Sequence, residues 1–236
     1  MSIETLVVAG TMGAVGSGIA YLSPHILAQM EKRRLRRLCR ERRVMALTYD
    51  DGPGACLTPR VLELIEAYAA RASFYLLGSR ATANPSIVDR LLAAGHEVGC
   101  HGFEHLHPWK VLPHNAVADV RRGYESISRW SPVTAGFRPP FGKLTLATWW
   151  QLRRRNTAIV WWTLDSGDTY AHLPKPVETA ARLAREGGGV VLLHDFDREP
   201  DRNNYVLRTT ELLLTTAQRE GIRPCTVSDL LKVAEG

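Results

Sequence analysis

Two adjacent carboxylates stand at the point where an apolar run ends. The run LTYDDGP at residues 47–53 begins as a short buried strand and stops at a Gly-Pro turn. Because neighbouring carboxylates repel each other, a plain surface turn gains little from Asp50 and Asp51. A cation to bind, or a proton to transfer, explains the pair. The other ligands of such a cation must then come from elsewhere in the chain.

Two histidines four positions apart, His101 and His105, are the first candidates for those ligands. On a helical turn this spacing places both imidazoles on one face, close enough to share a metal ion. A histidine pair of this kind on its own is usually structural or exposed. With one carboxylate from Asp50 or Asp51 it forms a set of two histidines and one carboxylate, which leaves coordination positions open for water and substrate.

Ionisable side chains recur where other predicted strands end. The run RPPFG at residues 138–142 follows one strand, DSGD at residues 165–168 follows another, and His194 with Asp195 follows a third. The strand interiors stay apolar. In α/β barrels the loops at the C-terminal ends of the strands meet at one face and carry the chemistry. We therefore expect these side chains to converge with the metal candidates.

The elements that position these residues alternate between strand and helix, which favours a parallel α/β arrangement. We predict a distorted seven-stranded (β/α) barrel over residues 44–236, preceded by an N-terminal apolar and basic helical arm at residues 1–43. The predicted strands cover residues 44–49, 72–77, 96–100, 134–138, 158–162, 189–194 and 222–225. The predicted helices lie near residues 59–70, 84–94, 115–129, 144–155, 176–186, 205–219 and 227–234.

Composition limits the class of protein. The chain has 236 residues, 45% of them hydrophobic and 23% charged, which is ordinary for a soluble globular protein. The net charge of +6 is uneven, because residues 1–43 hold eight Lys and Arg against three Glu and the rest is nearly neutral. The domain therefore lacks the basic surface that nucleic-acid binding needs. The four cysteines are scattered and form neither a disulfide framework nor a zinc motif.

The N-terminal arm combines an apolar run at residues 6–22 with a basic segment at residues 31–40. Seventeen residues are at the short end for a membrane span. A signal peptide places its positive charges before the apolar run, whereas here they follow it. This order predicts that the remaining chain stays on the cytoplasmic face of the inner membrane, with residues 1–43 on the membrane surface. A helix packed on its own domain is the alternative.

Five motifs, taken in order, resemble those of one known family. They are TYDDGP at 48–53, His101 with His105, RPPFG at 138–142, Asp165 with Asp168, and the run LLH that ends at His194. Together they resemble the NodB-homology polysaccharide deacetylases, also called carbohydrate esterase family 4. The similarity covers about residues 44–230.

The resemblance implies a role for each metal-site residue. Asp51, His101 and His105 are expected to bind a divalent metal, with zinc the usual ion and cobalt, nickel or manganese as alternatives. Asp50 is expected to act as the general base that takes a proton from water. Arg138 is expected to pair with Asp50 and to hold it ionised and oriented.

The resemblance also implies the groups that complete the reaction. The backbone N–H of Phe141 is expected to stabilise the oxyanion. His194 is expected to protonate the leaving amine, with Asp168 orienting it and raising its pKa. The chain departs from the family pattern at three positions. The family commonly has Asn where this chain has Cys100, Ser or Thr where it has Gly102, and Trp where it has Thr169. Two neighbouring tryptophans, Trp161 and Trp162, are candidates to replace the lost apolar wall beside His194, with Trp161 the one expected at the substrate.

These observations predict metal-dependent hydrolysis of the N-acetyl amide of an N-acetylhexosamine in a polysaccharide or lipid-linked glycan. The reaction releases acetate and belongs to envelope polysaccharide biosynthesis or modification. The partners are the glycan and a membrane surface, without nucleic acid. An extracytoplasmic deacetylase of peptidoglycan, chitin or exopolysaccharide is an alternative. An O-acetyl esterase and a non-catalytic sugar-binding protein are alternatives of other classes.

Overall fold

A parallel sheet with β1 in the middle organises the chain. The computed structural model describes residues 24–130 and 136–232. The sheet order is β3-β2-β1-β5-β4, and β6 pairs with the first half of β1. All pairs are parallel. The strands are β1 (Val44–Asp50), β2 (Ser73–Leu76), β3 (Glu97–Cys100), β4 (Leu164–Asp165), β5 (Gly189–His194) and β6 (Arg223–Cys225).

The register of β1 brings two of the predicted site residues together. All seven residues of β1 are buried, which fits a strand covered on both faces of a parallel sheet. Asp50 lies opposite Tyr75 on β2 and opposite His194 on β5. Because the strands are parallel, their carboxyl ends meet at one edge, and the polar side chains gather there.

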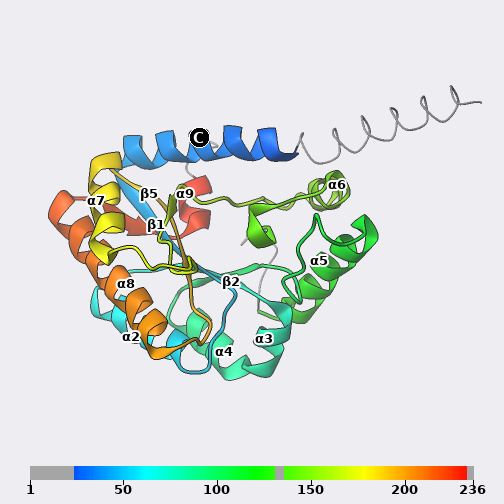
Figure 1. The fold of residues 1–236 in the computed structure, drawn as a ribbon, viewed down its shortest axis with the longest axis horizontal. Helices are drawn as coiled ribbons and strands as arrows, with labels where there is room; N and C mark the ends of the chain where they lie inside the picture. The colour runs from blue at the N-terminus through cyan, green and yellow to red at the C-terminus, as the bar shows by residue number, and fades with distance from the viewer. Residues whose placement is uncertain (1–23, 131–135, 233–236) are drawn as a thin grey trace, which may run out of the picture.

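Helices surround the sheet (Figure 1). Proline stands in the first turn of α4, α5, α7 and α8, where its fixed φ suits a helix start. The helices are α2 (Leu57–Ala67), α3 (Gly78–Ala83), α4 (Pro85–Ala93), α5 (Pro113–Ile127), α6 (Leu146–Arg154), α7 (Pro176–Glu186), α8 (Pro200–Glu220) and α9 (Val227–Lys232), with a 3-10 turn, η2, at Pro140–Gly142.

The predicted α/β arrangement is confirmed, and the strand count differs from the prediction. The described residues form six strands instead of seven. The strand expected at 134–138 lies partly outside the described residues. Its described part and the strand expected at 158–162 form single parallel bridges, from Cys100 to Phe137 and from Phe137 to Ile159. The short β4 was not predicted, because two residues carry no readable periodicity. Closure into a barrel stays a prediction.

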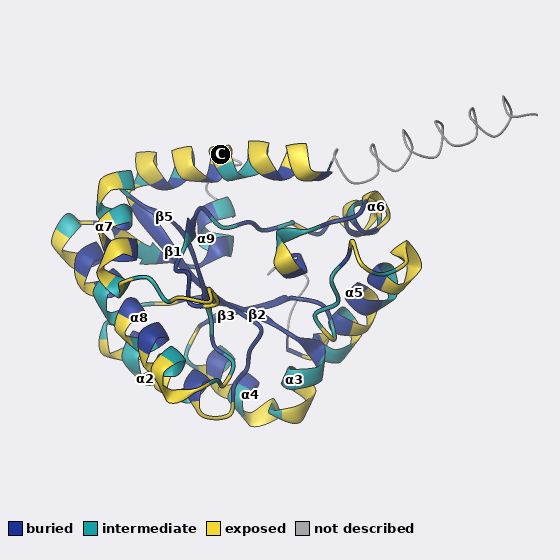
Figure 2. Cartoon of the chain, viewed as in Figure 1, coloured by how far each residue is buried: buried dark blue, intermediate teal, exposed yellow. Residues whose placement is uncertain are grey.

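The N-terminal helix, residues 24–42, crosses one side of the domain (Figure 1). Ala28, Leu35 and Cys39 face inward at helical spacing and pack in a cluster that includes Val160 and Trp161. The outer face of the helix is exposed (Figure 2). The helical arm is thus confirmed over these residues, and it packs on the domain. The apolar run at 6–22 lies outside the described residues.

Within the described ranges, every helix is too short or too polar to cross a bilayer. A boundary between an arm at 1–43 and a domain at 44–236 stays a prediction.

Candidate active site

The three predicted metal ligands lie together at the sheet edge. The Oδ1 atom of Asp51 is 3.4 Å from Nε2 of His101 and 3.3 Å from Nε2 of His105. One ligand atom from each residue lies within 4.8 Å of the others. Within the described part of the chain, these three residues form a group able to hold a metal ion.

The backbone around each ligand aims it at the common point. Asp51 directly follows β1 with φ of 67°, and its carbonyl accepts a hydrogen bond from Nη1 of Arg80 at 2.6 Å. His101 follows β3, and its Nδ1 donates to the carbonyl of Arg138 at 2.7 Å. A carbonyl can only accept, so Nδ1 carries the hydrogen and Nε2 presents its lone pair. The helical turn expected at 101–105 is absent, because His105 stands in a loop with φ of 58°.

The chemistry of these three residues fits a divalent cation. Oδ1 of Asp51 is buried and has no hydrogen-bond partner. Burial lowers the pKa of His101 to about 3 and also lowers the pKa of His105, so both rings are neutral. Neutral imidazole and carboxylate are the forms that ligate metals. A cation at this point satisfies the orphaned oxygen and the two lone pairs together.

Asp50 is held mainly by Arg138, and its Oδ2 lies 3.8 Å from Nε2 of His101. Nη1 of Arg138 donates to Oδ1 of Asp50 at 2.8 Å and to Oγ1 of Thr48 at 2.6 Å. The guanidinium lies 4.2 Å from the ring centroid of Tyr75 and is fully buried. Burial raises the pKa of Asp50, and the neighbouring Arg138 charge opposes that rise. The two aspartates thus have distinct surroundings, which can separate a base from a ligand.

His194 forms a second, separate pair with Asp168. Nδ1 of His194 lies 2.9 Å from Oδ1 of Asp168, and the backbone N–H of His194 donates to Oδ2 at 2.9 Å. Burial acts to lower the pKa of His194, but the Asp168 carboxylate outweighs it, and the pKa rises to about 9. Burial likewise acts against ionisation of Asp168, and His194 with Arg198 still brings its pKa below the usual value. The pair therefore holds a protonated imidazole at neutral pH.

Arginines behind this pair were not anticipated from the sequence. Arg198 donates to Oδ2 and to the carbonyl of Asp168, at 2.9 and 2.8 Å, and Arg202 donates to the same carbonyl at 2.9 Å. The ring of Phe196 meets that of His194 edge-on, with centroids 6.3 Å apart. Phe196 thus supplies an aromatic neighbour that Thr169 cannot. Phe196 and Arg198 lie in the loop after β5, and Arg202 lies in the first turn of α8. Their position after a strand end was the available sequence signal.

Phe141 borders the metal candidates, whereas Trp161 does not lie at the substrate position expected for it. Phe141 has φ of 57°, and its ring centroid is 4.4 Å from that of His105. Trp161 is buried in the cluster beneath the N-terminal helix. Its neighbour Trp162 lies against Gly142, where a Cβ atom would be 2.6 Å from the indole.

A buried carboxylate occupies the place of the hydroxyl missing at Gly102. Asp119 of α5 accepts hydrogen bonds from the backbone N–H groups of Phe103 and Glu104 at 3.1 and 2.9 Å. Gly102 has φ of 90°, and a Cβ there would lie 2.5 Å from Oδ2 of Asp119. A Cβ on Gly123 would lie 2.6 Å from the backbone of Gly102. The two glycines thus let α5 approach and brace the ligand loop.

The third departure, Cys100, is a buried residue of β3. The backbone N–H of Gly102 donates to its Sγ at 3.4 Å. Burial raises the pKa of the Cys100 thiol to about 12. The group is therefore a neutral thiol, which is neither a metal ligand nor a nucleophile at physiological pH.

A candidate cation site beside a buried carboxylate and a protonated imidazole, at the carboxyl edge of a parallel sheet, is an arrangement typical of hydrolases. The model of the polysaccharide deacetylase family matches residues 37–160. The chain belongs to this family.

Two relatives of known name support this membership, and a solved structure shares the fold. A peptidoglycan-N-acetylglucosamine deacetylase of Bacillus cereus is 30% identical over 192 residues, which cover 80% of this chain and 89% of that protein. The deacetylase PgdA of Listeria monocytogenes is 28% identical over 189 residues, covering 79% of this chain and 38% of PgdA. The crystal structure of the Bc1960 peptidoglycan N-acetylglucosamine deacetylase superposes with a TM-score of 0.73 at 24% identity, covering 82% of this chain and 90% of that one.

Proposed function

We propose that this protein hydrolyses the N-acetyl amide of an N-acetylhexosamine in a glycan and releases acetate. The observation that carries the proposal is the pairing of Asp50 with His194 on neighbouring strands, beside the Asp51, His101 and His105 set. One group is placed to take a proton and the other to give one. The similar Bacillus cereus protein is named for N-acetylglucosamine in peptidoglycan, which supports an N-acetylated glycan as substrate.

Asp51, His101 and His105 hold the divalent cation in this proposal. Two imidazoles and a carboxylate suit zinc, and cobalt, nickel or manganese accept the same donors. When bound, the cation acts as a Lewis acid on the amide carbonyl and lowers the pKa of water. The neutral state of His101 and His105 supports this assignment.

The protons move through the other residues. Asp50 accepts a proton from the water whose oxygen attacks the carbonyl carbon, and Arg138 holds the carboxylate in place. The backbone N–H of Phe141 donates to the carbonyl oxygen as negative charge develops on it. His194 then gives its proton to the amide nitrogen as the carbon–nitrogen bond breaks. Acetate and the free amine are the products, and Asp168 keeps Nδ1 of His194 oriented.

Acetate release from chito-oligosaccharide, with and without chelator, tests this proposal. Chelation should abolish release, and added zinc should restore it. The variant Asp50→Asn should lower kcat by at least about 100-fold, the loss typical of a missing general base. Glu104→Gln is the matched control, because Glu104 is an exposed carboxylate between the two histidines. Release that resists chelation, or equal rates for both variants, contradicts the proposal. O-acetylated glycan run in parallel separates an amidase from an esterase.

We further propose that the enzyme works at the cytoplasmic face of the inner membrane, on glycan intermediates of the envelope. The eight basic residues of positions 1–43 support this placement, because anionic lipid headgroups attract such segments. An extracytoplasmic site of action is the competing proposal. A reporter fused after Arg43 distinguishes the two: activity only on the cytoplasmic side supports the proposal, and periplasmic activity refutes it.

A further inference from the structure

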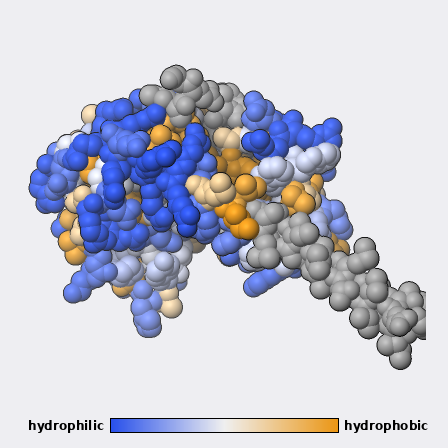
Figure 3. Space-filling model, turned by 90° about the horizontal axis from the view of Figure 1, so that it is seen from above, coloured by the Kyte–Doolittle hydropathy of each residue, from blue (hydrophilic) through white to orange (hydrophobic). Residues whose placement is uncertain are grey.

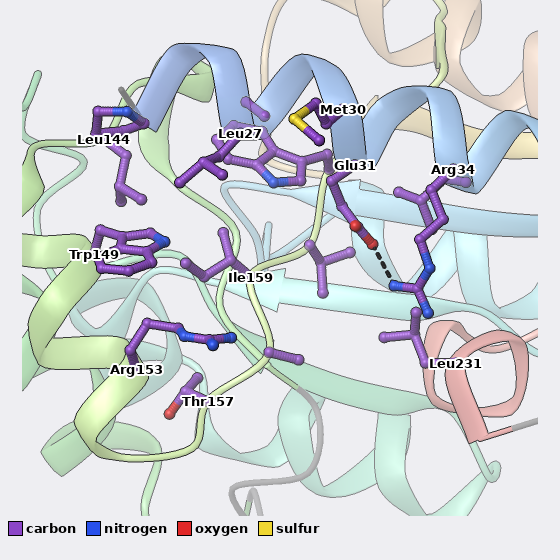
Figure 4. Close-up of a pocket in the computed structure, with 16 residues that line it drawn as sticks. Leu27, Met30, Glu31, Arg34, Leu144, Trp149, Arg153, Thr157, Ile159 and Leu231 are labelled. Atoms are coloured by element: carbon purple, nitrogen blue, oxygen red, sulfur yellow. Dashed lines mark hydrogen bonds and ion pairs between the residues drawn. The ribbon is translucent and has the colours of Figure 1, made fainter. Parts of the chain in front are cut away.

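A large apolar groove lies beneath the N-terminal helix, outside the catalytic residues. It has a volume of about 570 Å³ and is bounded by helix 24–42, α6, residues 157–161 and α9. In Figure 4, Leu27, Glu31 and Arg34 point from the helix toward α6 and the extended segment, and Met30 lies alongside the helix. Six of its apolar lining residues are Leu27, Met30, Leu144, Trp149, Ile159 and Trp161. We call this feature the helix groove.

The helix groove has polar as well as apolar walls. Glu31 and Arg34 form an ion pair at 2.9 Å, and Thr157 and Arg153 line the side opposite the helix (Figure 4). Pairing largely neutralises Glu31. Apolar side chains make up the larger part of the remaining lining, which suits the hydrocarbon portion of an amphipathic ligand.

The mouth of the helix groove exposes large apolar side chains. Met30 is 61% exposed and Leu27 is 43% exposed, and both line the groove. Figure 3 shows a hydrophobic patch next to a broad hydrophilic area on the face seen from above. Contiguous exposed apolar surface on a soluble domain usually marks a site that binds something.

The helix groove is joined to the catalytic edge by two short connections. Leu144 lines the groove, and Phe141, three residues earlier, stacks near His105. Trp161 also lines the groove, and its neighbour Trp162 lies against Gly142. Residues 141–144 and the pair Trp161–Trp162 thus link the lining of the groove to residues that border the metal candidates.

Two ammonium groups lie along these connections. Nζ of Lys32 is 4.3 Å from the ring centroid of Trp162 and 5.8 Å from that of Trp161. Nζ of Lys143 is 4.4 Å from the ring of Trp109. Burial lowers the pKa of Lys32, and the charges of Arg36, Lys143 and Arg138 lower it further while Asp165 opposes them. An anion placed here would relieve this accumulation of positive charge.

We propose that the helix groove binds the hydrocarbon chain of a lipid-linked glycan, with its phosphate beside Lys32 and Lys143 and its N-acetyl sugar at the metal site. This inference rests on the proposed deacetylation and names its substrate class. The order of these features along the protein favours this occupant. The apolar groove, the two lysines and the catalytic residues follow one another in the same order as the hydrocarbon chain, the phosphate and the sugar of such a lipid. A second protein copy explains the apolar walls but not the cations that lead to the active site.

The test compares two substrates in detergent solution: polyprenyl diphosphate N-acetylglucosamine and soluble chito-oligosaccharide. The variants Leu27→Asp and Met30→Asp place a carboxylate at the groove mouth. Each should lower the ratio of kcat/KM for the polyprenyl substrate over the oligosaccharide at least fivefold, because losing contact with one methylene group costs about fourfold. Val177→Asp is the matched control. It changes an apolar residue that is 55% exposed on α7, and should keep the wild-type ratio.

A binding measurement uses the tryptophans of the groove. A bromine-labelled long-chain alkyl phosphate should quench the fluorescence of Trp149 and Trp161 to saturation, and quenching should weaken in Met30→Asp. If labelled anionic vesicles quench the fluorescence and the soluble alkyl phosphate does not, the groove docks on a bilayer. That result overturns the proposal.

The two proposals fail in different ways. Acetate release from both substrates, with an unchanged ratio in Leu27→Asp and Met30→Asp, overturns the groove assignment and leaves the deacetylase standing. If neither substrate releases acetate, the proposed function is refuted. The quenching result then tests the groove assignment on its own.

Discussion

Removing the carboxylate of Asp119 should loosen the metal site without touching a ligand. Asp119 is 5% exposed and accepts two backbone hydrogen bonds, from Phe103 and Glu104, which lie between the ligands His101 and His105. A hydrogen bond to a charged group contributes about 1.5–3 kcal/mol. Because both bonds share one carboxylate, we expect Asp119→Ala to lower the free energy of unfolding by about 3 kcal/mol.

The larger consequence concerns the metal. Groups that orient ligands typically change metal affinity by about 10–100-fold when they are removed. We therefore expect Asp119→Ala to weaken zinc binding by at least about tenfold, and Asp119→Asn by less, since an amide oxygen still accepts one bond. Competition with a chromophoric chelator measures the affinity, and urea unfolding of the metal-free protein measures stability.

The matched control is Glu125→Ala, which removes an exposed carboxylate from the same helix. It should leave both quantities near their wild-type values. Wild-type zinc affinity in a destabilised Asp119→Ala would refute the assignment of Asp119 as a brace of the ligand loop. The same refutation follows if Glu125→Ala weakens zinc binding equally.

Further predictions concern pH and backbone conformation. Since the pKa of His194 is about 9, kcat should fall as pH rises through about 9, and Asp168→Asn should move that limb to lower pH. Because the pKa of His194 is raised from its usual value of 6.5, protonation of this residue stabilises the fold by about 3 kcal/mol below pH 6.5. Urea unfolding should show this stabilisation disappearing as pH rises from 6.5 to about 9. Arg138→Met should raise the pKa of Asp50 further, which shifts the acidic limb of the rate profile upward. Gly102→Ser, which restores a hydroxyl, should lower the melting temperature, because its Cβ would lie 2.5 Å from a carboxylate oxygen at φ of 90°.

The sequence was sufficient to predict which strand ends carry the polar residues. Parallel strands bring their carboxyl ends to one edge, so Asp50, His101 and His194 had to meet once the α/β alternation was recognised. The spacing of His101 and His105 pointed to the metal site, although for the wrong reason. Their convergence comes from a strand end and a left-handed loop residue instead of a helical turn.

Tertiary packing decided what sequence patterns could not. Adjacent residues of an extended segment face opposite sides. The sequence pattern alone could not decide which of Trp161 and Trp162 is buried, and the structure buries Trp161 in the cluster beneath the N-terminal helix. The contact of Asp119 with the ligand loop depends on how closely α5 approaches, and that distance is set by Gly102 and Gly123. Arg198 likewise reaches Asp168 from a loop that carries no motif.

Three residues of the site have left-handed backbone conformations. The φ angles of Asp51, His105 and Phe141 are 67°, 58° and 57°. Each such conformation costs a non-glycine residue about 1–3 kcal/mol and persists only where the surroundings enforce it. Arg80 holds the carbonyl of Asp51, and Asp119 holds the loop before His105. Substitutions that remove these supports should therefore reduce metal affinity before they unfold the sheet, since the strain is released locally while β1 stays buried.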